Sequence, residues 1–131
     1  MSTRGIRNNN PGNIRRVPGT TWLGQTATQL DPSFIQFDDP KYGIRAIARI
    51  MASYERQGID TIGEAIDRWA PPNENNSQAY VDAVCASCGI GADTPVQLTT
   101  ILPELVKAII HHENGSQPYS DELIAEGIAL A

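Results

Sequence analysis

The sequence has no long apolar run, and this absence argues against a membrane-spanning helix. Residues 1–7 also lack an apolar stretch, so we expect no signal peptide and another route to any target outside the cytoplasm. Apolar residues make up 40% and charged residues 19% of the 131 residues, which is typical of a globular protein with a core. No repeat or long linker divides the chain, so we expect one domain over residues 1–131.

Acidic residues are missing from the first 30 positions. That segment holds Arg4, Arg7, Arg15 and Arg16, a formal charge of +4. Residues 31–131 hold six basic and fifteen acidic residues, −9, which brings the whole chain to −5. A negative chain is a poor nucleic-acid binder, so we expect no nucleic-acid partner. The basic segment either faces an anionic ligand or pairs with the acidic remainder of the chain.

Cysteine is scarce, since the chain holds only Cys85 and Cys88. Their C-x-x-C spacing occurs in redox and metal sites, but no second pair accompanies it. His111 and His112 are adjacent, and adjacent side chains on a helix point about 100° apart. We therefore interpret the two cysteines as small buried thiols, and we expect neither a metal nor a cofactor.

An apolar helix that ends in an acid is the strongest pattern in the sequence. Its apolar face, spaced as on one side of a helix, is Leu102, Leu105, Val106 and Ile109. Thr99 or Thr100 is expected to cap the start, and Asn114-Gly115 to end the helix. Glu113 continues the apolar face, where partial desolvation favours the protonated carboxyl that a general acid needs. We predict a catalytic acid at Glu113, with a solvated helix end as the alternative.

Cap and stop residues predict four further helices. The expected caps are Asp39, Thr61, Ser77 and Ser120. Gly58 and Pro71-Pro72 are the expected stops of the first two helices. Residues 22–28 and 33–37 predict a small β-hairpin. The expected fold class is therefore mainly α with one small β element. The hairpin's aromatic residues, expected to cover a groove or a core, are Trp22, Phe34 and Phe37.

Two stretches resemble parts of lytic transglycosylases. At residues 108–118, Ala-Ile-Ile-His-His-Glu-Asn-Gly-Ser-Gln-Pro is similar to that family's apolar helix with a Glu-Ser-Gly motif followed by Asn-Pro. Residues 68–70 and 80–84 are similar to its aromatic-Asn-Ala-Gly turn and its Tyr-Val-x-x-Val helix. The family's catalytic acid matches Glu113, and its site-lining tyrosine matches Tyr80. Asn114 in place of serine and Ala70-Pro71-Pro72 in place of Asn-Ala-Gly depart from the pattern and put substrate contacts in question.

The N-terminal part resembles bacterial glucosaminidases. Asn-Pro-Gly-Asn-Ile at residues 10–14, Trp22-x-Gly24 and Phe34-x-x-Phe37 are similar to that family's Asn-Leu-Phe-Gly-Ile segment and Trp-x-Gly hairpin. In both families the acid helix comes first, whereas here it comes last. The resemblance therefore implies a circularly permuted lysozyme-like domain. The whole chain is similar to small phage-encoded lytic or structural proteins, which implies a virion or a periplasmic, cell-wall location and peptidoglycan or other phage proteins as partners.

The resemblance implies cleavage of peptidoglycan glycan strands, with Glu113 protonating the glycosidic oxygen. A transglycosylase needs one acid because the sugar's own 6-hydroxyl attacks, whereas most retaining and inverting hydrolases need a second carboxylate. Glu74, Asp31 and Asp38 are the candidates for a second acid, and we favour the single-acid mechanism. The expected substrate-binding residues are Tyr80, Glu74, Asn10, Asn13, Gln36 and Trp69. Of these, we expect Tyr80 to orient the substrate or Glu113, and Trp69 to form a packing wall.

Two other functions remain open. The first is a non-catalytic virion protein that binds cell-wall glycan or packs against other phage proteins, because a fold persists without its active site. The second is a zinc peptidase that uses His111, His112 and Glu113. The order His-His-Glu does not place both histidines on one helix face, as the His-Glu-x-x-His motif does.

Overall fold

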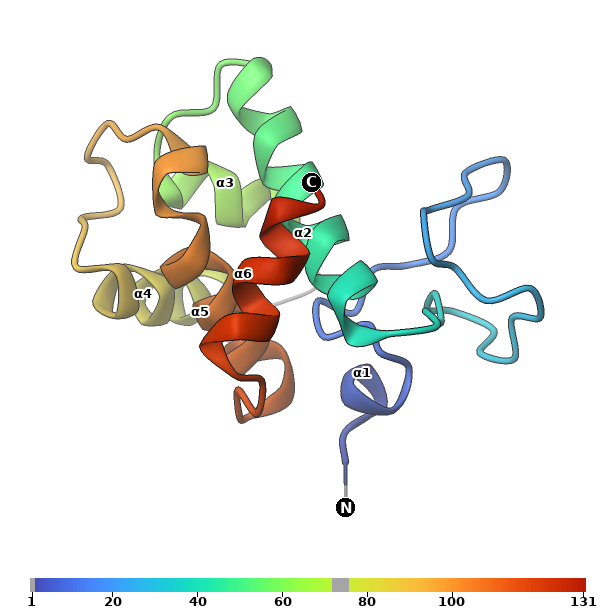
Figure 1. Ribbon diagram of the computed structural model, residues 1–131. Coiled ribbons are helices and arrows are strands. Elements are labelled where there is room, and N and C mark those ends of the chain that lie inside the picture. The colour runs from blue at the N-terminus through green and yellow to red at the C-terminus, as the bar shows by residue number, and fades with distance from the viewer. Residues whose placement is uncertain (1, 72–75) are drawn as a thin grey trace.

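The computed structural model describes residues 2–71 and 76–131, and in them the chain is mainly α, as predicted (Figure 1). The long helix α2 runs through the middle with α6 packed along it, while α4 packs against both α3 and α5. No helix in these two ranges is both long and apolar enough to cross a membrane. The elements are α1 (Arg4–Arg7), α2 (Pro40–Arg56), α3 (Ile62–Trp69), α4 (Ser77–Cys88), the 3₁₀ helix η1 (Leu98–Ile101), α5 (Leu102–Asn114) and α6 (Asp121–Ala129).

Local capping chemistry sets most of the helix starts. The caps Asp39, Thr61 and Ser120 each accept a hydrogen bond from a backbone N–H of the first turn, as predicted. The predicted cap Ser77 is wrong by one residue, because the Asn76 side chain accepts from the Ala79 N–H at 3.2 Å. Asparagine caps a helix as well as serine does, so the two neighbours compete for the role.

Helix α5 starts without a side-chain cap, so the predicted cap at Thr99 or Thr100 is also wrong. Both threonines lie inside η1, which leads directly into α5. A 3₁₀ turn at a helix end pairs backbone groups that a capping side chain would otherwise satisfy. The predicted end is confirmed, since Gly115 adopts a left-handed conformation with φ of 76° directly after the helix.

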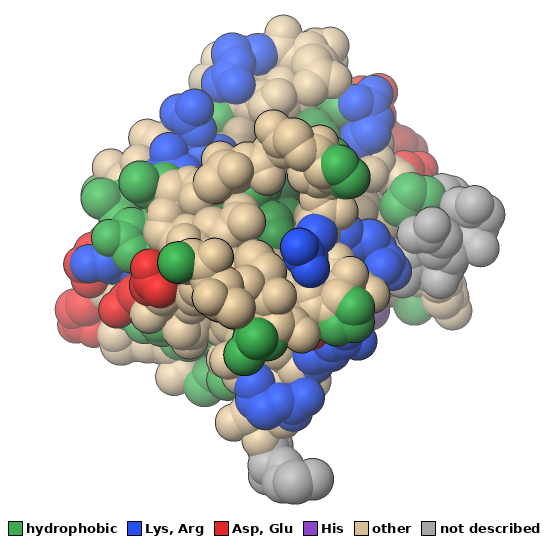
Figure 2. Space-filling model, turned by 90° about the vertical axis from the view of Figure 1, so that its right-hand side faces the viewer, with side chains coloured by type: hydrophobic (Ala, Val, Ile, Leu, Met, Phe, Trp, Pro, Cys, Tyr) green, Lys and Arg blue, Asp and Glu red, His purple; other side chains and the backbone are tan. Residues whose placement is uncertain are grey.

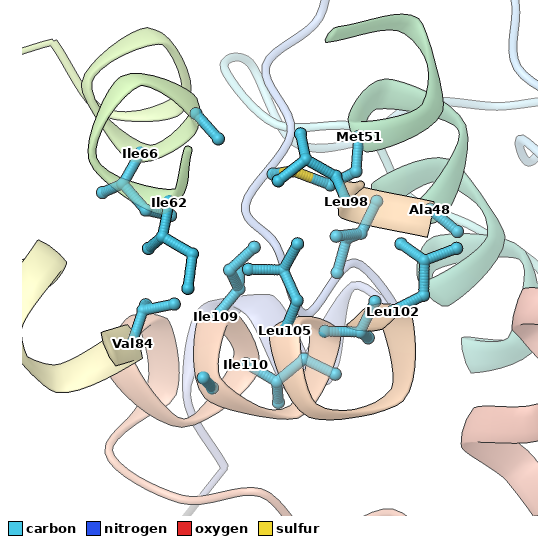
Figure 3. Packing of buried hydrophobic residues seen from close by; sticks show 14 of the residues in the cluster. Ala48, Met51, Ile62, Ile66, Val84, Leu98, Leu102, Leu105, Ile109 and Ile110 are labelled. Carbon is cyan, nitrogen blue, oxygen red and sulfur yellow. The ribbon is translucent and has the colours of Figure 1, made fainter. Parts of the chain in front are cut away.

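The core lies between α5 and helices α2, α3 and α4. The predicted apolar face of α5 is buried, and its most exposed member, Leu102, is only 7% exposed. Figure 3 shows Leu105 and Ile109 pointing from α5 toward side chains of the other three helices. Burial of an aliphatic side chain of this size contributes about 1.5–3 kcal/mol. Helix α5 is therefore held along its length, which gives Glu113 a rigid support.

The predicted β-hairpin is wrong. Residues 22–28 and 33–37 do lie side by side, but only isolated antiparallel bridges form, at Arg15–Phe34 and Gln25–Phe37. Side chains take the backbone groups that a ladder would use. The Gln29 side chain bonds both the N–H and the carbonyl of Gln36, at 2.9 Å each. Local side-chain hydrogen bonds of this kind compete with regular secondary structure.

The N-terminal segment, residues 2–38, crosses the C-terminal end of α5, and the short helix α1 lies there although no sequence pattern predicted it (Figure 1). The buried Asn114 side chain donates to the Pro11 carbonyl at 2.8 Å and accepts from the Thr3 hydroxyl at 2.6 Å. At Gly5 a β-carbon would lie 2.6 Å from Asn114 Oδ1. Only glycine permits this close approach, which places residues 3–13 against the last turn of α5.

Candidate active site

The Glu113 carboxyl group is held by two hydrogen-bond donors from distant parts of the chain. Asn13 Nδ2 donates to Oε1 at 3.0 Å, and the Tyr80 hydroxyl donates to Oε2 at 2.8 Å. The side chain is partly exposed at the last turn of α5. A described residue thus donates a hydrogen bond to each of the two carboxyl oxygens, which fixes the orientation of the group.

Tyr80 is buried behind Glu113 and is itself fixed from two sides. It is 2% exposed, and its oxygen accepts a hydrogen bond from Trp69 Nε1 at 3.1 Å. Its ring stacks on that of His112, with 3.8 Å between centroids. Burial, and then the charge of Glu113, raise the pKa of Tyr80 far above its usual value. The hydroxyl therefore stays protonated and donates a hydrogen bond to Glu113.

Asn13 makes its contact from an unusual conformation. Its φ is 51°, in the left-handed region where asparagine is more common than most other residues. Its Oδ1 atom is buried and has no hydrogen-bond partner among the described residues. Such strained or unsatisfied groups in native structures cluster at functional sites. Here both features belong to the residue that holds Glu113.

A groove of about 600 Å³ opens beside Glu113, between the N-terminal segment and helices α2, α3 and α5. Gly12 lies against the Trp69 ring, since a β-carbon there would be 3.1 Å from Trp69 Cη2. The groove combines apolar ring faces with a few charged groups, as small-ligand sites commonly do. Its aromatic lining is Trp22, Phe34, Tyr54 and Trp69, and its charged lining is Arg15, Arg68 and Glu113.

Four of the predicted site residues come together in space. Asn13, Trp69 and Tyr80 form one hydrogen-bonded cluster with Glu113. The Tyr80 bond to Glu113 matches one of the two roles predicted for this residue, whereas Asn13, predicted as a sugar contact, bonds the acid. Trp69 serves as the predicted wall and also as a donor to Tyr80.

Asn10 and Gln36 lie elsewhere and organise the N-terminal segment. Asn10 is fully buried, and its side chain donates to the carbonyls of Ile14 and Ile35 at 2.9 Å each. Gln36 accepts from the Leu30 N–H at 2.7 Å through its side chain. Neither residue lines the groove, so these two predicted sugar contacts have no place in the site as the structure shows it.

Two of the three candidates for a second carboxylate, Asp31 and Asp38, do not line the groove beside Glu113. Asp31 is bonded by both Nε and Nη2 of Arg4 at 2.6 Å and also accepts from Asn8 Nδ2. Asp38 is exposed and does not line the groove. Glu74 lies outside the described residues. Among the groove residues that the structure describes, Glu113 is thus the one acid.

Three groups near the site were not predicted as site residues. Arg15 and Arg68 line the groove, and His112 stacks on Tyr80. The sequence contained weak signals for the arginines, because Arg15 belongs to the basic segment and Arg68 precedes Trp69.

Two of the three aromatic residues expected to cover a groove or a core, Trp22 and Phe34, line the groove. The third, Phe37, is buried in a small cluster with Ile35.

The C-x-x-C pair lies one turn apart on α4, away from the groove lining. Both cysteines are free and partly buried, and both pack against the core. Burial raises the pKa of Cys88 to about 11 and also raises the pKa of Cys85. A thiol that keeps its proton at neutral pH is a poor nucleophile and a poor metal ligand.

Comparison with known proteins places the chain in a phage family. No model of a known protein family matches it. The chain is 40% identical over 129 residues to protein P5 of Pseudoalteromonas phage PM2, across 96% of this chain and 80% of P5. The chain belongs to the family of this P5 protein. The predicted bacteriophage association is thereby confirmed, and the name P5 describes no activity.

Proposed function

We propose that this protein cleaves the glycan strands of peptidoglycan, with Glu113 as the general acid. The observation that carries the proposal is the setting of this carboxyl group. It lies at the edge of an aromatic-lined groove, with Asn13 and Tyr80 each bonded to one of its oxygens. An oriented acid beside a groove for a sugar chain is what glycosidic cleavage requires.

The proposed reaction follows the single-acid route. Glu113 gives its proton to the glycosidic oxygen, and the bond from that oxygen to the anomeric carbon breaks. The 6-hydroxyl of the same sugar forms the new bond to that carbon, and its proton passes to the Glu113 carboxylate. The donors Asn13 and Tyr80 stabilise that carboxylate between the two proton transfers.

The places of Asp31 and Asp38, both outside the groove lining, support this route over a two-carboxylate hydrolase that would use either of them. A retaining hydrolase needs two carboxyl groups roughly 5–5.5 Å apart, and an inverting one needs them roughly 6.5–9.5 Å apart. Asp31 is engaged with Arg4, so it is not available as a nucleophile or base. The lysozyme-like, permuted fold implied by the resemblance belongs to the same proposal.

Replacement of Glu113 by glutamine tests the proposal. Glu113→Gln keeps the shape of the side chain and removes the proton that it donates, so turnover of purified peptidoglycan should fall by at least about 100-fold. Glu104→Gln is the matched control, because Glu104 is an exposed acid at the other end of α5. Mass spectrometry of the products identifies the bond: anhydro-muramic ends indicate a transglycosylase, reducing muramic ends a muramidase and reducing glucosamine ends a glucosaminidase.

The alternative is a non-catalytic virion component that binds cell-wall glycan or other phage proteins. Membership of a phage protein family supports this alternative as well as a virion-borne enzyme acting in the periplasm or cell wall. Wild-type protein that binds peptidoglycan without releasing products would favour it. Equal turnover by Glu113→Gln and Glu104→Gln would instead move the acid to another residue, with Glu74 the next candidate.

A further inference from the structure

We propose that Arg15 and Arg68 make the groove selective for glycan strands that carry carboxylate groups. This inference rests on the proposed function and names the substrate chemistry of the same site. Muramic sugars carry a lactyl carboxylate or, through it, a stem peptide with its own carboxylates, whereas chitin-type strands are neutral. The two arginines therefore provide a means of telling these strands apart.

Arg15 presents an unneutralised charge on the N-terminal wall of the groove. The Phe34 ring lies near two guanidinium groups, with centroid distances of 4.6 Å to Arg4 and 5.1 Å to Arg15. Arg4 is neutralised by its bidentate pair with Asp31. Arg15 is exposed and has no carboxylate partner within the described part of the chain. Stacking on an aromatic ring orients a guanidinium without using up its N–H groups.

Arg68 presents a second charge from helix α3. Its guanidinium carbon lies 5.8 Å from the Tyr54 ring centroid, and its Nη1 donates to Gln57 Oε1 at 3.0 Å. The ring and the neutral amide orient the group, and no described carboxylate neutralises it. Arg68 also adjoins Trp69, the residue that reaches Glu113 through Tyr80. The second charge and the acid thus line the same groove.

The charge of the groove differs in sign from that of the molecule. Two arginines and one glutamate line its described part, whereas the whole chain carries −5. Figure 2 shows the face formed by the N-terminal segment, where Lys and Arg side chains are spread widely and Asp and Glu gather toward the edges. Guanidinium groups bind carboxylates through paired N–H donors, so a carboxylate-bearing strand fits this lining better than a neutral one.

The test measures binding in the Glu113→Gln background, where strands stay intact. The strands are soluble peptidoglycan with stem peptides, the same strands stripped by an amidase, and neutral chitin oligosaccharides. Arg15→Gln and Arg68→Gln should each raise the Kd for peptidoglycan strands about 5- to 10-fold and leave the Kd for chitin unchanged. Arg49→Gln is the control, since Arg49 is exposed on α2 and outside the groove lining.

The outcomes separate this inference from the proposed function. If the rise in Kd caused by Arg15→Gln and Arg68→Gln persists on stripped strands, the arginines bind the lactyl carboxylate. If the rise disappears on stripped strands, they bind the stem peptide. Equal effects on chitin, or an equal effect of Arg49→Gln, would overturn the inference even where Glu113→Gln abolishes turnover. If wild-type protein shows no turnover while Arg15→Gln and Arg68→Gln each weaken binding of peptidoglycan strands but not of chitin, the proposed function fails and the selectivity stands.

Discussion

At the scale of single residues, Tyr80 connects the acid to the core. It donates to Glu113, accepts from Trp69 and stacks on His112. Removing its hydroxyl leaves the Glu113 carboxylate with one donor, which is Asn13. The orientation of the Glu113 carboxyl group beside the groove is then less firmly fixed.

We predict that Tyr80→Phe lowers kcat about tenfold, because the loss of one hydrogen bond leaves the acid less firmly oriented. Trp69→Phe keeps the Tyr80 bond to Glu113, so its effect on kcat should be smaller. Steady-state rates of both variants and the wild type check the prediction. An equal loss of rate in the two variants would mean that Tyr80 serves packing alone.

Asp31 is a structural anchor of the N-terminal segment. The hydrogen-bonded Arg4 guanidinium, aided by backbone N–H donors from Phe34 and Ser33, holds the pKa of Asp31 well below its usual range. A carboxyl with a lowered folded pKa contributes stability above its unfolded pKa, about 4, and loses it as the pH falls toward the folded value.

We predict that Asp31→Asn is less stable than wild type at pH 7 and that the difference shrinks below about pH 4. Urea unfolding at pH 7, 5 and 3 measures it. Asp38→Asn is the matched control, because Asp38 is exposed seven residues further along the same segment. A difference that stays constant from pH 7 to pH 3 would show that the Arg4 pair contributes nothing through charge.

At the scale of elements, the clamp between α5 and the N-terminal segment builds the site. Asn114 bonds Pro11, Thr3 and the Ile110 carbonyl, so one buried side chain joins two chain regions about 100 positions apart. The same crossing brings Asn13 to Glu113. In the comparison with lytic transglycosylases, Asn114 stands where that family has a serine. In this fold its side chain holds the end of α5 against the N-terminal segment.

We predict that Asn114→Ala destabilises the protein by about 1–3 kcal/mol, because it leaves the buried Pro11 carbonyl unpaired. Turnover should fall as well, since Asn13 loses its support. Thr3→Val removes only one of these bonds and should cost less. Chemical denaturation with a parallel rate assay gives both quantities. An unchanged unfolding midpoint for Asn114→Ala would show that the Asn114 hydrogen bonds do not stabilise the fold.

At the scale of the whole molecule, the uneven charge predicts the salt response of cell-wall binding. If the net charge of −5 governed binding to anionic wall polymer, added salt would screen repulsion and strengthen binding. If the arginines of the groove govern it, added salt weakens binding. The two cases differ in sign, so the measurement decides between them.

We predict weaker binding of the Glu113→Gln protein to purified cell walls at 1 M than at 0.1 M salt, where the screening length is about 3 Å and about 10 Å respectively. Co-sedimentation of the protein with the walls measures this. A flat response would assign the N-terminal arginines to internal contacts, as the structure already does for Arg4.

The sequence by itself determined the five longer helices, α2 to α6, and the acid at the end of α5. Helical periodicity and caps such as Asp39 and Ser120 act over a few residues, so they can be recognised without the fold. The hairpin prediction failed where the Gln29 side chain accepts from the Gln36 N–H, a backbone group that a ladder would use. Nothing in a strand pattern reports that competition.

Only the tertiary structure decided what surrounds Glu113. Asn13 lies 100 positions before it in the chain, and Tyr80 lies 33 before it. No local spacing relates residues so far apart. Packing therefore decides which asparagine of the N-terminal segment bonds the acid, as Asn13 does, and which bonds the interior, as Asn10 does. Asn13 lies at the site and Asn10 is fully buried. This difference follows from how the segment crosses α5.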